Sequence, residues 1–387
     1  MEILIAFDKF KEALSAPEAC RIAAREVARH FPAATIHRRP LTDGGEGFVD
    51  TLVDALSGTF HDVRVSGPYG APVTARWGLI EAAAIPAAAR TLLDLPATAQ
   101  RLAVVEMANA SGLALTAPAE RDPWLASSRG IGEVIAAATD TGVDAIVIGL
   151  GGSATNDLGL GALTALGLRC LDARGELVEP PTPATWPRVA SLQGQLRPDL
   201  PPLRVACDVT NPVLGPRGAS AVYGPQKGLL APDLPRLDDA MATMAVRVCA
   251  HLGAPAALIE QPGSGAAGAI AAGFLATGRA RLLPGFEFVS ALLGLPERIA
   301  AADLIITGEG GFDDSSLEGK GPGSLVTAGL AARKRVTVFA GRIQLSTTPP
   351  GLTAVAISPP DLPLPQALRE TPSRLAAAVR SAFASPA

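Results

Sequence analysis

The sequence predicts an α/β protein in which both ends of the chain build one doubly wound parallel-sheet domain. A second, mixed α/β domain is expected as an insertion between them. Strand and helix patterns alternate at both chain ends, which favours parallel strands joined by helices. Between them, alternating strands flank a Gly-Pro-Tyr-Gly turn at 67–70, as in an antiparallel hairpin. We expect domains at 1–57 plus 291–387 and at 58–290, with the active site in the cleft between them.

The opening of the chain predicts two strand–helix pairs. Residues 2–6, Glu-Ile-Leu-Ile-Ala, are apolar after the first and are expected to form a buried strand. Residues 15–18, Ser-Ala-Pro-Glu, have the spacing of a capping box with proline in the first turn, so a helix should begin there. A strand at 35–39 then leads through a glycine-rich turn to a helix that ends near Leu56.

The rest of the chain is divided by the same criteria. In the inserted part, strands are expected at 61–65, 73–80, 90–95, 102–106, 145–148 and 203–207. Helices are expected there at 130–139, 159–167 and 234–252. The strand–helix alternation then returns, with strands at 303–307, 335–340 and 353–357 and a closing helix over 372–384.

Composition restricts the class of protein. The 387 residues are 48% hydrophobic and 18% charged, which suits buried cores and argues against disorder. The net charge of −4 gives no electrostatic footprint for nucleic acid or an anionic membrane. The four cysteines are scattered, so neither a disulfide framework nor a zinc site is indicated. With no signal-peptide pattern or bilayer-spanning stretch, we expect a cytoplasmic protein.

Five turns combine glycine with polar side chains, and each follows a short apolar strand. They lie at 8–11, 43–47, 151–157, 208–211 and 308–314. Because the carboxyl ends of parallel strands line the ligand crevice of such sheets, we expect these turns to share one site. Their carboxylates and lysines suit phosphoryl transfer: ammonium groups for phosphate oxygens, carboxylates for Mg²⁺, and one carboxylate to accept a hydroxyl proton.

The turn at 151–157 is the most informative of the five. Glycines there would let an anion approach the backbone, and the following helix should offer unpaired N–H groups at its start. No Gly-Lys-Ser/Thr follows, so this is not a Walker A loop. An ordinary strand-to-helix turn is the alternative.

Each other turn also has a structural alternative. Asp8 and Asp208 could satisfy loop amides at strand ends, and the turn after Asp43 could cap the next helix. Lys227 could be a solvated turn lysine. No histidine lies in the five turns, so a Ser/His/Asp triad lacks its base.

From end to end the chain resembles the bacterial type I glycerate kinase family. The matching stretches are FDKFKEALSA, PLTDGGEGF, GLGGSATND, CDVTNPVLGPRGASAVYGPQKG, PGSGAAG, and ADLIITGEGGFDD followed by GKGP. The resemblance implies a Rossmann- or flavodoxin-like domain with an inserted mixed α/β domain, the glycerate kinase I fold. It also implies phosphorylation of D-glycerate to 2-phosphoglycerate with ATP and Mg²⁺, in organic-acid catabolism.

The resemblance, together with the residue pattern, gives a set of expected site residues. Catalytic roles are expected for Asp8, Lys11, Asp43, Asp157 and Asp208. ATP is expected at Gly151, Gly152, Ser153, Asn156, Lys227, Gly308, Glu309, Asp313 and Lys320, and Mg²⁺ at Asp208 and Asp313. The expected partners are D-glycerate and ATP, with no nucleic acid or membrane; a homodimer is compatible with the sequence.

The chain departs from the family pattern at several of these turns. Lys9 stands where serine is usual, Gly311 where arginine is usual, and Leu158 where glycine is usual. Glu12-Ala13 replaces Gly-Ser, and Ser315-Ser316 replaces Gln-Thr. The lost arginine removes a planar donor fork, and Lys9 could replace its charge. A kinase of another small hydroxy acid, or a non-catalytic metabolite-binding homologue, therefore stay open as alternatives.

Overall fold

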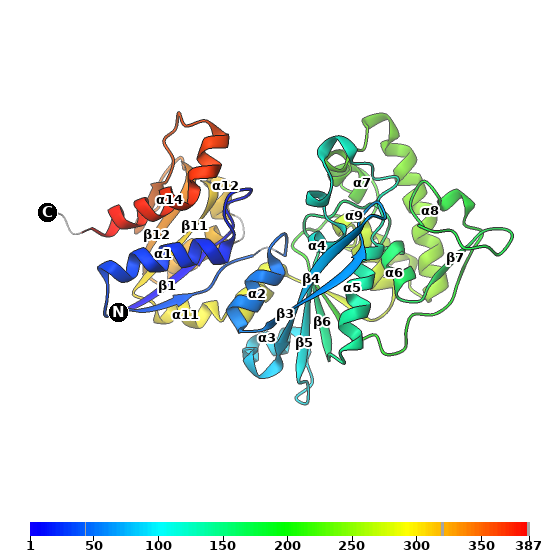
Figure 1. Cartoon of the computed structure of the whole chain (residues 1–387), viewed down its shortest axis with the longest axis horizontal. Helices are drawn as coiled ribbons and strands as arrows, with labels where there is room; N and C mark the ends of the chain where they lie inside the picture. The colour runs from blue at the N-terminus through cyan, green and yellow to red at the C-terminus, as the bar shows by residue number, and fades with distance from the viewer. Residues whose placement is uncertain (43, 319–320, 385–387) are drawn as a thin grey trace. The chain divides into compact units, whose positions relative to one another are not determined.

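The structure, a computed structural model, describes residues 1–42, 44–318 and 321–384. The chain forms two compact units (Figure 1). Unit 1 comprises Met1–Asp43, Asp50–Ser57 and Phe286–Ala387, and unit 2 comprises Gly44–Val49 and Gly58–Gly285. Both chain ends thus contribute to unit 1, whereas a short N-terminal stretch belongs to unit 2. The domain limits expected from the sequence, at 57/58 and 290/291, stay a prediction.

Unit 1 contains a five-stranded, fully parallel sheet in the order β13-β12-β11-β1-β2. Its strands are β1 (Glu2–Phe7), β2 (Thr35–Arg38), β11 (Leu304–Asp313), β12 (Arg335–Gln344) and β13 (Leu352–Ala356). Numbered along the chain within this unit, the order is 2-1-3-4-5, which is the flavodoxin-like order. The strand order reverses between β1 and β11, so the carboxyl ends of these two strands flank the switch point where ligands bind in such sheets.

Helices cover this sheet and complete its core. They are α1 (Ala16–His30), α10 (Gly285–Leu292), α11 (Leu295–Ala301), α12 (Asp314–Glu318), α13 (Pro322–Ala331) and α14 (Leu364–Phe383), with α2 (Phe48–Leu56) crossing from unit 2 into unit 1. The capping box at Ser15 and Glu18 is confirmed. α1 and α14 pack together over apolar side chains of β1, where buried Glu26 of α1 accepts a hydrogen bond from Arg380 of α14.

Unit 2 contains a six-stranded sheet in the order β10-β9-β6-β5-β4-β3. Its strands are β3 (Thr59–Ser66), β4 (Pro72–Glu81), β5 (Arg101–Glu106), β6 (Ala145–Gly149), β9 (Leu203–Ala206) and β10 (Ala280–Leu283). Strands β5, β6, β9 and β10 are parallel, whereas β3 and β4 form the expected antiparallel hairpin at one edge. Two short strands, β7 (Arg169–Leu171) and β8 (Ser191–Gln193), pair separately.

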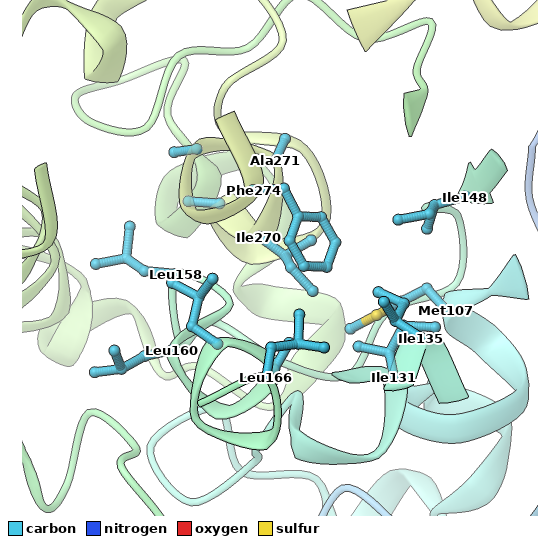
Figure 2. Packing of buried hydrophobic residues seen from close by; sticks show 14 of the residues in the cluster. Met107, Ile131, Ile135, Ile148, Leu158, Leu160, Leu166, Ile270, Ala271 and Phe274 are labelled. Carbon is cyan, nitrogen blue, oxygen red and sulfur yellow. The ribbon is translucent and has the colours of Figure 1, made fainter. Parts of the chain in front are cut away.

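The core of unit 2 lies between the sheet and its helices (Figure 2). These helices are α3 (Ala87–Leu93), α4 (Met107–Ser111), α5 (Arg129–Asp140), α6 (Leu160–Ala165), α7 (Ala219–Tyr223), α8 (Leu234–Leu252) and α9 (Ala266–Ala276). Ile148 of β6, Ile135 of α5 and Phe274 of α9 are fully buried members of one cluster. Among the described residues, no helix combines the length and apolar character needed to cross a membrane.

One predicted strand is wrong. Residues 90–95 lie mostly in α3, which begins at Ala87 and ends at Leu93. α3 begins with three consecutive alanines, which favour a helix. Ala89 and Leu93, four residues apart, are both buried, which is the spacing of one helical face.

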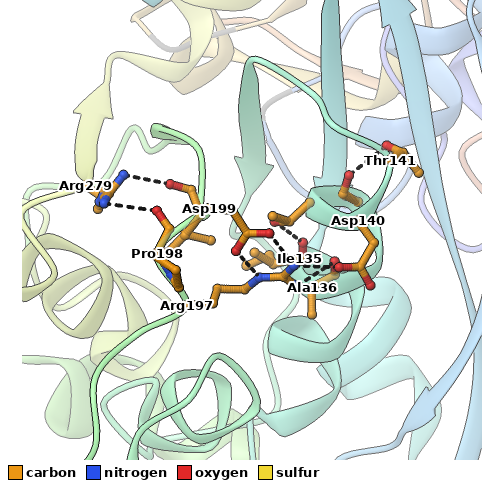
Figure 3. A network of polar contacts seen from close by, with 11 residues as sticks. Ile135, Ala136, Asp140, Thr141, Arg197, Pro198, Asp199 and Arg279 are labelled. Carbon is orange, nitrogen blue, oxygen red and sulfur yellow. Dashed lines mark hydrogen bonds and ion pairs between the residues drawn. The ribbon is translucent and has the colours of Figure 1, made fainter.

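The proline-rich connection that precedes β9 is held to unit 2 by two arginines (Figure 3). Arg197 donates to the carbonyl of Ala136 in α5 at 3.1 Å and forms ion pairs with Asp140 and Asp199. The hydrogen bond with Asp199 is the main cause that raises the pKa of Arg197. Arg279 donates to the carbonyl of Leu200 at 2.9 Å. The connection is therefore anchored to α5 and to the residue preceding β10.

Leu158 provides a test of how burial competes with backbone strain. It has a left-handed backbone, with φ 56°, yet its side chain is only 1% exposed. Replacement by alanine removes buried apolar surface and keeps the strained backbone, whereas glycine also removes the strain. We expect both variants to lower the free energy of unfolding by about 2–5 kcal/mol. L158G should be less destabilised than L158A, by about 1 kcal/mol, in urea denaturation.

An L158G variant that unfolds more easily than L158A would show that backbone strain at this position is negligible.

Candidate active site

In unit 1, Asp8 directly follows β1 at the switch point of the sheet. Its N–H donates to the carbonyl of Gly308 in β11 at 2.9 Å, and its Oδ1 accepts from the N–H of Lys9 at 2.7 Å. The start of α13 is close by, because a Cβ built on Gly321 would lie 3.6 Å from Asp8 Oδ2. Asp8 is half-buried. The arrangement places a carboxylate where a parallel sheet of this order binds ligands.

The predicted turn at 308–314 is wrong. β11 continues through Gly308 and Glu309 to Asp313 and pairs with β12 along this length. Gly308 allows the two strands to approach, because a Cβ there would overlap the carbonyl oxygen of Phe339. Asp313 ends the strand and accepts hydrogen bonds from Ser315 Oγ at 2.5 Å and Ser316 N–H at 3.1 Å. These bonds lower the pKa of Asp313, which remains ionised at the start of α12.

Lys11 lies beside a small pocket of about 90 Å³ in unit 1. Arg342, at the carboxyl end of β12, lines the same pocket, and both side chains are exposed. Arg342 is in register with Gly311 on β11, where a Cβ would meet no atom within 4 Å. Arg342 is therefore the residue on the neighbouring strand that lies opposite position 311, where the family pattern has arginine.

Two predicted site residues, Asp43 and Lys320, lie outside the described residues. Their expected roles stay predictions.

In unit 2, the carboxyl edge of the parallel strands carries Glu106 at the end of β5, the turn 150–157 after β6, and Asp208 after β9. The stretch Gly44–Val49 lies on this edge, because the N–H of Gly151 donates to the carbonyl of Gly44 at 3.0 Å. A Cβ on Gly149 would lie 2.6 Å from that same carbonyl oxygen. Gly149 and Gly151 thus make room for this chain's own backbone, and Gly152, with φ 75°, is the exposed glycine of the turn.

Sequence reasoning missed Glu106. Its side chain is 2% exposed, and its two oxygens accept from the N–H groups of Gly47 and Val49, both at 3.1 Å. Glu106 thereby holds the Gly44–Val49 stretch and the first turn of α2 on the sheet edge. The one available signal was the acidic residue that ends the otherwise apolar strand predicted at 102–106.

The predicted catalytic residue Asp157 is placed differently from what the sequence suggested. It is fully buried and accepts from the N–H and Oγ of Ser128 at 2.7 and 2.8 Å, and from the N–H groups of Gly159 and Gly161 at 3.2 Å. Ser128 Oγ in turn accepts from Ala162 N–H at 3.0 Å. The expectation that the helix start offers unpaired N–H groups is therefore wrong: Asp157 and Ser128 bind them. Burial raises the pKa of Asp157, and its hydrogen bonds oppose that shift.

Lys227 is buried against the glycine turn and is not a solvated turn lysine. Its side chain is 1% exposed, and Nζ donates to Ser153 Oγ at 3.0 Å and to the carbonyl of Thr155 at 2.6 Å. Desolvation lowers the pKa of Lys227 to about 7, and the negative charge of Asp157 acts in the opposite direction. The amine is therefore close to the point of gaining or losing its proton at neutral pH.

Near the groups that bind Lys227, three buried side-chain oxygen atoms have no hydrogen-bond partner in the described chain. Thr155 Oγ1, Asn156 Oδ1 and Ser111 Oγ are buried without a hydrogen-bond partner. Such atoms are rare in proteins and call for an additional partner, such as water or a ligand. The N–H groups of exposed Gly152 and of Ser153 likewise donate to no acceptor among the described residues. The turn thus retains donors at its surface.

Asp208 is half-exposed after β9, and its Oδ1 accepts from Gly285 N–H at 3.0 Å. Within the described ranges, no group of three or more His, Cys, Asp or Glu side chains could hold a metal ion. Mg²⁺ is commonly bound by one or two carboxylates, with waters and substrate phosphates supplying the other ligands. Asp208 in unit 2 and Asp313 in unit 1 each carry the carboxylate that such a site uses.

These groups define an α/β protein that presents carboxylates, cationic side chains and backbone donors at the carboxyl ends of its parallel strands, as small-molecule enzymes do. A family model described as the glycerate kinase family matches residues 3–385. The chain belongs to the glycerate kinase family.

Individual relatives agree with this assignment. The chain is 39% identical over 347 residues to a glycerate kinase of Bacillus subtilis, covering 89% of this chain and 85% of that protein. It is 36% identical over 349 residues to a glycerate 2-kinase of Escherichia coli, covering 89% and 86%. A crystal structure assigned as glycerate kinase 2 from Salmonella typhimurium LT2 superposes with a TM-score of 0.79 at 36% identity, covering 99% and 97%. The similarity to these homologues supports kinase activity, and membership of the glycerate kinase family implies the use of ATP.

The depressed pKa of Lys227 predicts a specific dependence of stability on pH. Between pH 7 and 10.5 the unfolded chain binds the lysine proton and the folded chain does not, so the free energy of unfolding should rise with pH in this window. Below pH 7 the contribution is constant. Relative to K227M, which cannot titrate here, the native protein should gain up to about 1.4 kcal/mol per pH unit. Urea denaturation of both proteins at several pH values measures the difference.

A parallel pH dependence of the two proteins would show that Lys227 titrates normally in the folded state.

Glu106 predicts a positioning effect that can be separated from stability. E106Q replaces one acceptor oxygen with an NH₂ group and leaves a backbone N–H of the Gly44–Val49 stretch unpaired, which costs about 1–3 kcal/mol. We expect kcat/KM to fall at least about tenfold, because the Gly44–Val49 stretch, which contains most of the predicted turn at 43–47, is no longer fixed on the sheet edge.

E133Q is a matched control, since Glu133 also accepts from a backbone N–H, that of Ser66 at 2.7 Å, elsewhere in unit 2. It should lower Tm without lowering kcat/KM. Equal kinetic effects in the two variants would leave Glu106 with a purely structural role.

Proposed function

We propose that this protein transfers the γ-phosphoryl group of ATP to the 2-hydroxyl of D-glycerate and yields 2-phosphoglycerate. The reaction would serve organic-acid catabolism in the cytoplasm. The observation that carries the proposal is the buried contact of Lys227 with Ser153 beneath the Gly152 turn, in a chain of the glycerate kinase family.

The unit 2 groups suit the phosphates of ATP. The N–H groups of Gly152 and Ser153 would donate to phosphate oxygens, and the Lys227 amine beneath them would stabilise the added negative charge. Asn156 is fully buried and would orient this turn rather than contact nucleotide. A lysine fixed by two hydrogen bonds needs no reorganisation when charge develops.

The unit 1 groups suit the hydroxy acid. Lys11 and Arg342 are two cationic side chains beside one small pocket, which is the chemistry that binds a carboxylate. Arg342, in register with Gly311, would supply the guanidinium group that the family pattern places at position 311, so Lys9 need not do so. Glu309, on the same strand end, stays a candidate contact to the nucleotide.

The proton of the attacking hydroxyl needs a carboxylate acceptor. Asp157 is already bound by four donors and fully buried, so we propose that it positions α5 and α6. Asp8 and Asp208, both half-exposed at strand ends, are the candidates for proton acceptor. That both units contribute to one active site in a shared cleft remains a prediction.

Mg²⁺ would be held by Asp208 or Asp313 together with phosphate oxygens of ATP. The metal would neutralise phosphate charge, which is needed because carboxylates outnumber lysines among the predicted site residues.

The proposal is tested by measuring ADP release and identifying the product. D-Glycerate should be the preferred acceptor over glycolate, tartronate and lactate, the product should be 2-phosphoglycerate by ³¹P NMR, and excess EDTA should abolish turnover. Preference for another hydroxy acid would favour the alternative kinase. Ligand binding without ADP release from any acceptor would favour a non-catalytic homologue.

A further inference from the structure

Strand β3 (Thr59–Ser66) forms one edge of the unit 2 sheet and pairs with β4 on its other side. In an antiparallel pair, successive residues direct their backbone groups alternately toward and away from the partner strand. Gly67 N–H donates across the hairpin to the carbonyl of Ala71, so the odd-numbered residues face β4. Ser66 N–H points the other way and donates to Glu133. The backbone groups of the preceding even-numbered residues therefore face outward.

Two of the residues whose backbone groups face outward, Asp62 and Arg64, carry side chains of opposite charge. Asp62 and Arg64 are both exposed and lie on the same face of β3, two residues apart. Asp62 pairs with Arg76 of β4 at 3.1 Å, whereas Arg64 has no ion pair in the part of the chain that the structure describes. Val63, between them, lies on the opposite face.

An open groove runs along this edge beside α5. It measures about 660 Å³ and is lined by Val63, Val65 and Ala136 together with charged side chains at its margins. The edge thus offers outward-facing backbone groups that pair with no strand in the described part of the chain, together with a self-complementary charge pair and an apolar strip, to the same partner.

We propose that β3 pairs antiparallel with β3 of a second copy of this chain, around a two-fold axis at Val63. The two six-stranded sheets would then join into one continuous sheet across a homodimer. Asp62 and Arg64 would exchange backbone hydrogen bonds with Arg64 and Asp62 of the partner subunit, respectively. Val63 would meet Val63 of the partner subunit beside the groove.

The charges select this register. Because outward-facing residues must meet outward-facing residues, the two-fold axis must pass through a residue, and the axes at 62, 63 and 64 are those that set the two charged residues opposite themselves or each other. An axis at 62 places Asp62 opposite itself, and an axis at 64 places Arg64 opposite itself; like charges directly opposite destabilise a pair. An axis at 63 places opposite charges together twice. Side chains of one charge sign protect an edge strand against pairing. A strand that carries one acidic and one basic side chain is instead complementary to an antiparallel copy of itself.

Charge reversal tests the proposal because two single variants should complement each other. R64D and D62R each place like charges opposite one another and should be monomeric in sedimentation velocity at concentrations where the native protein is dimeric. An equimolar mixture should recover the dimer, and so should the double variant D62R/R64D. R174D, at an exposed turn of the same unit, is the matched control and should remain dimeric. Circular dichroism melting confirms that each variant is folded.

A disulfide test reads the register directly. In a C207S background, which removes the one cysteine that is not buried, V63C should form a dimer-linking disulfide under mild oxidation. R174C should not. A native protein that stays monomeric over a wide concentration range would overturn the proposal. So would a dimer that persists in both single variants, or one that V63C does not cross-link.

Discussion

The carboxyl edge of the unit 2 sheet depends on a close approach between two stretches of backbone. Gly44 and Gly45 lie against Gly149 and Gly151, where side chains would collide with the opposing chain. A hydrogen bond from Gly151 to Gly44 and the two that Glu106 accepts fix this contact. Through it, residues from the N-terminal part of the sequence lie on the carboxyl edge of a sheet whose first strand begins at Thr59.

This constraint gives the glycines of the turn different tasks. Gly149 and Gly151 are needed for packing, since their missing side chains are replaced by the chain's own backbone. Gly152 is exposed and left-handed, and it is the position at which a ligand can reach the backbone. The glycine-rich motif therefore has a structural function in addition to the binding function proposed for it, and its sequence does not separate the two.

Local patterns were sufficient to predict much of the fold. The capping box at Ser15, the hairpin of β3 and β4, and α8 follow from periodicity and turn chemistry, which act over a few residues. The strand end at Asp313 could not be predicted, because β11 is extended by pairing with β12, a strand that starts more than twenty residues later. The role of Asp157 depends on Ser128, 29 residues earlier, and no local pattern contains that partner.

In the candidate site, too, local motifs predict which residues matter, whereas their contacts depend on residues far away in the sequence. The motif predicted that Lys227 matters, but its burial and its bond to Ser153, 74 residues away, come from tertiary structure. An uncharged or partly charged buried amine costs less than a permanent charge, and it can take up a proton when an anion arrives. If phosphate binds at Gly152 and Ser153 as proposed, its charge raises the pKa of Lys227, and binding becomes coupled to proton uptake. Arginine could not serve in this way, because its guanidinium stays protonated; the proposed role would therefore account for a lysine at this position in a chain with only five lysines.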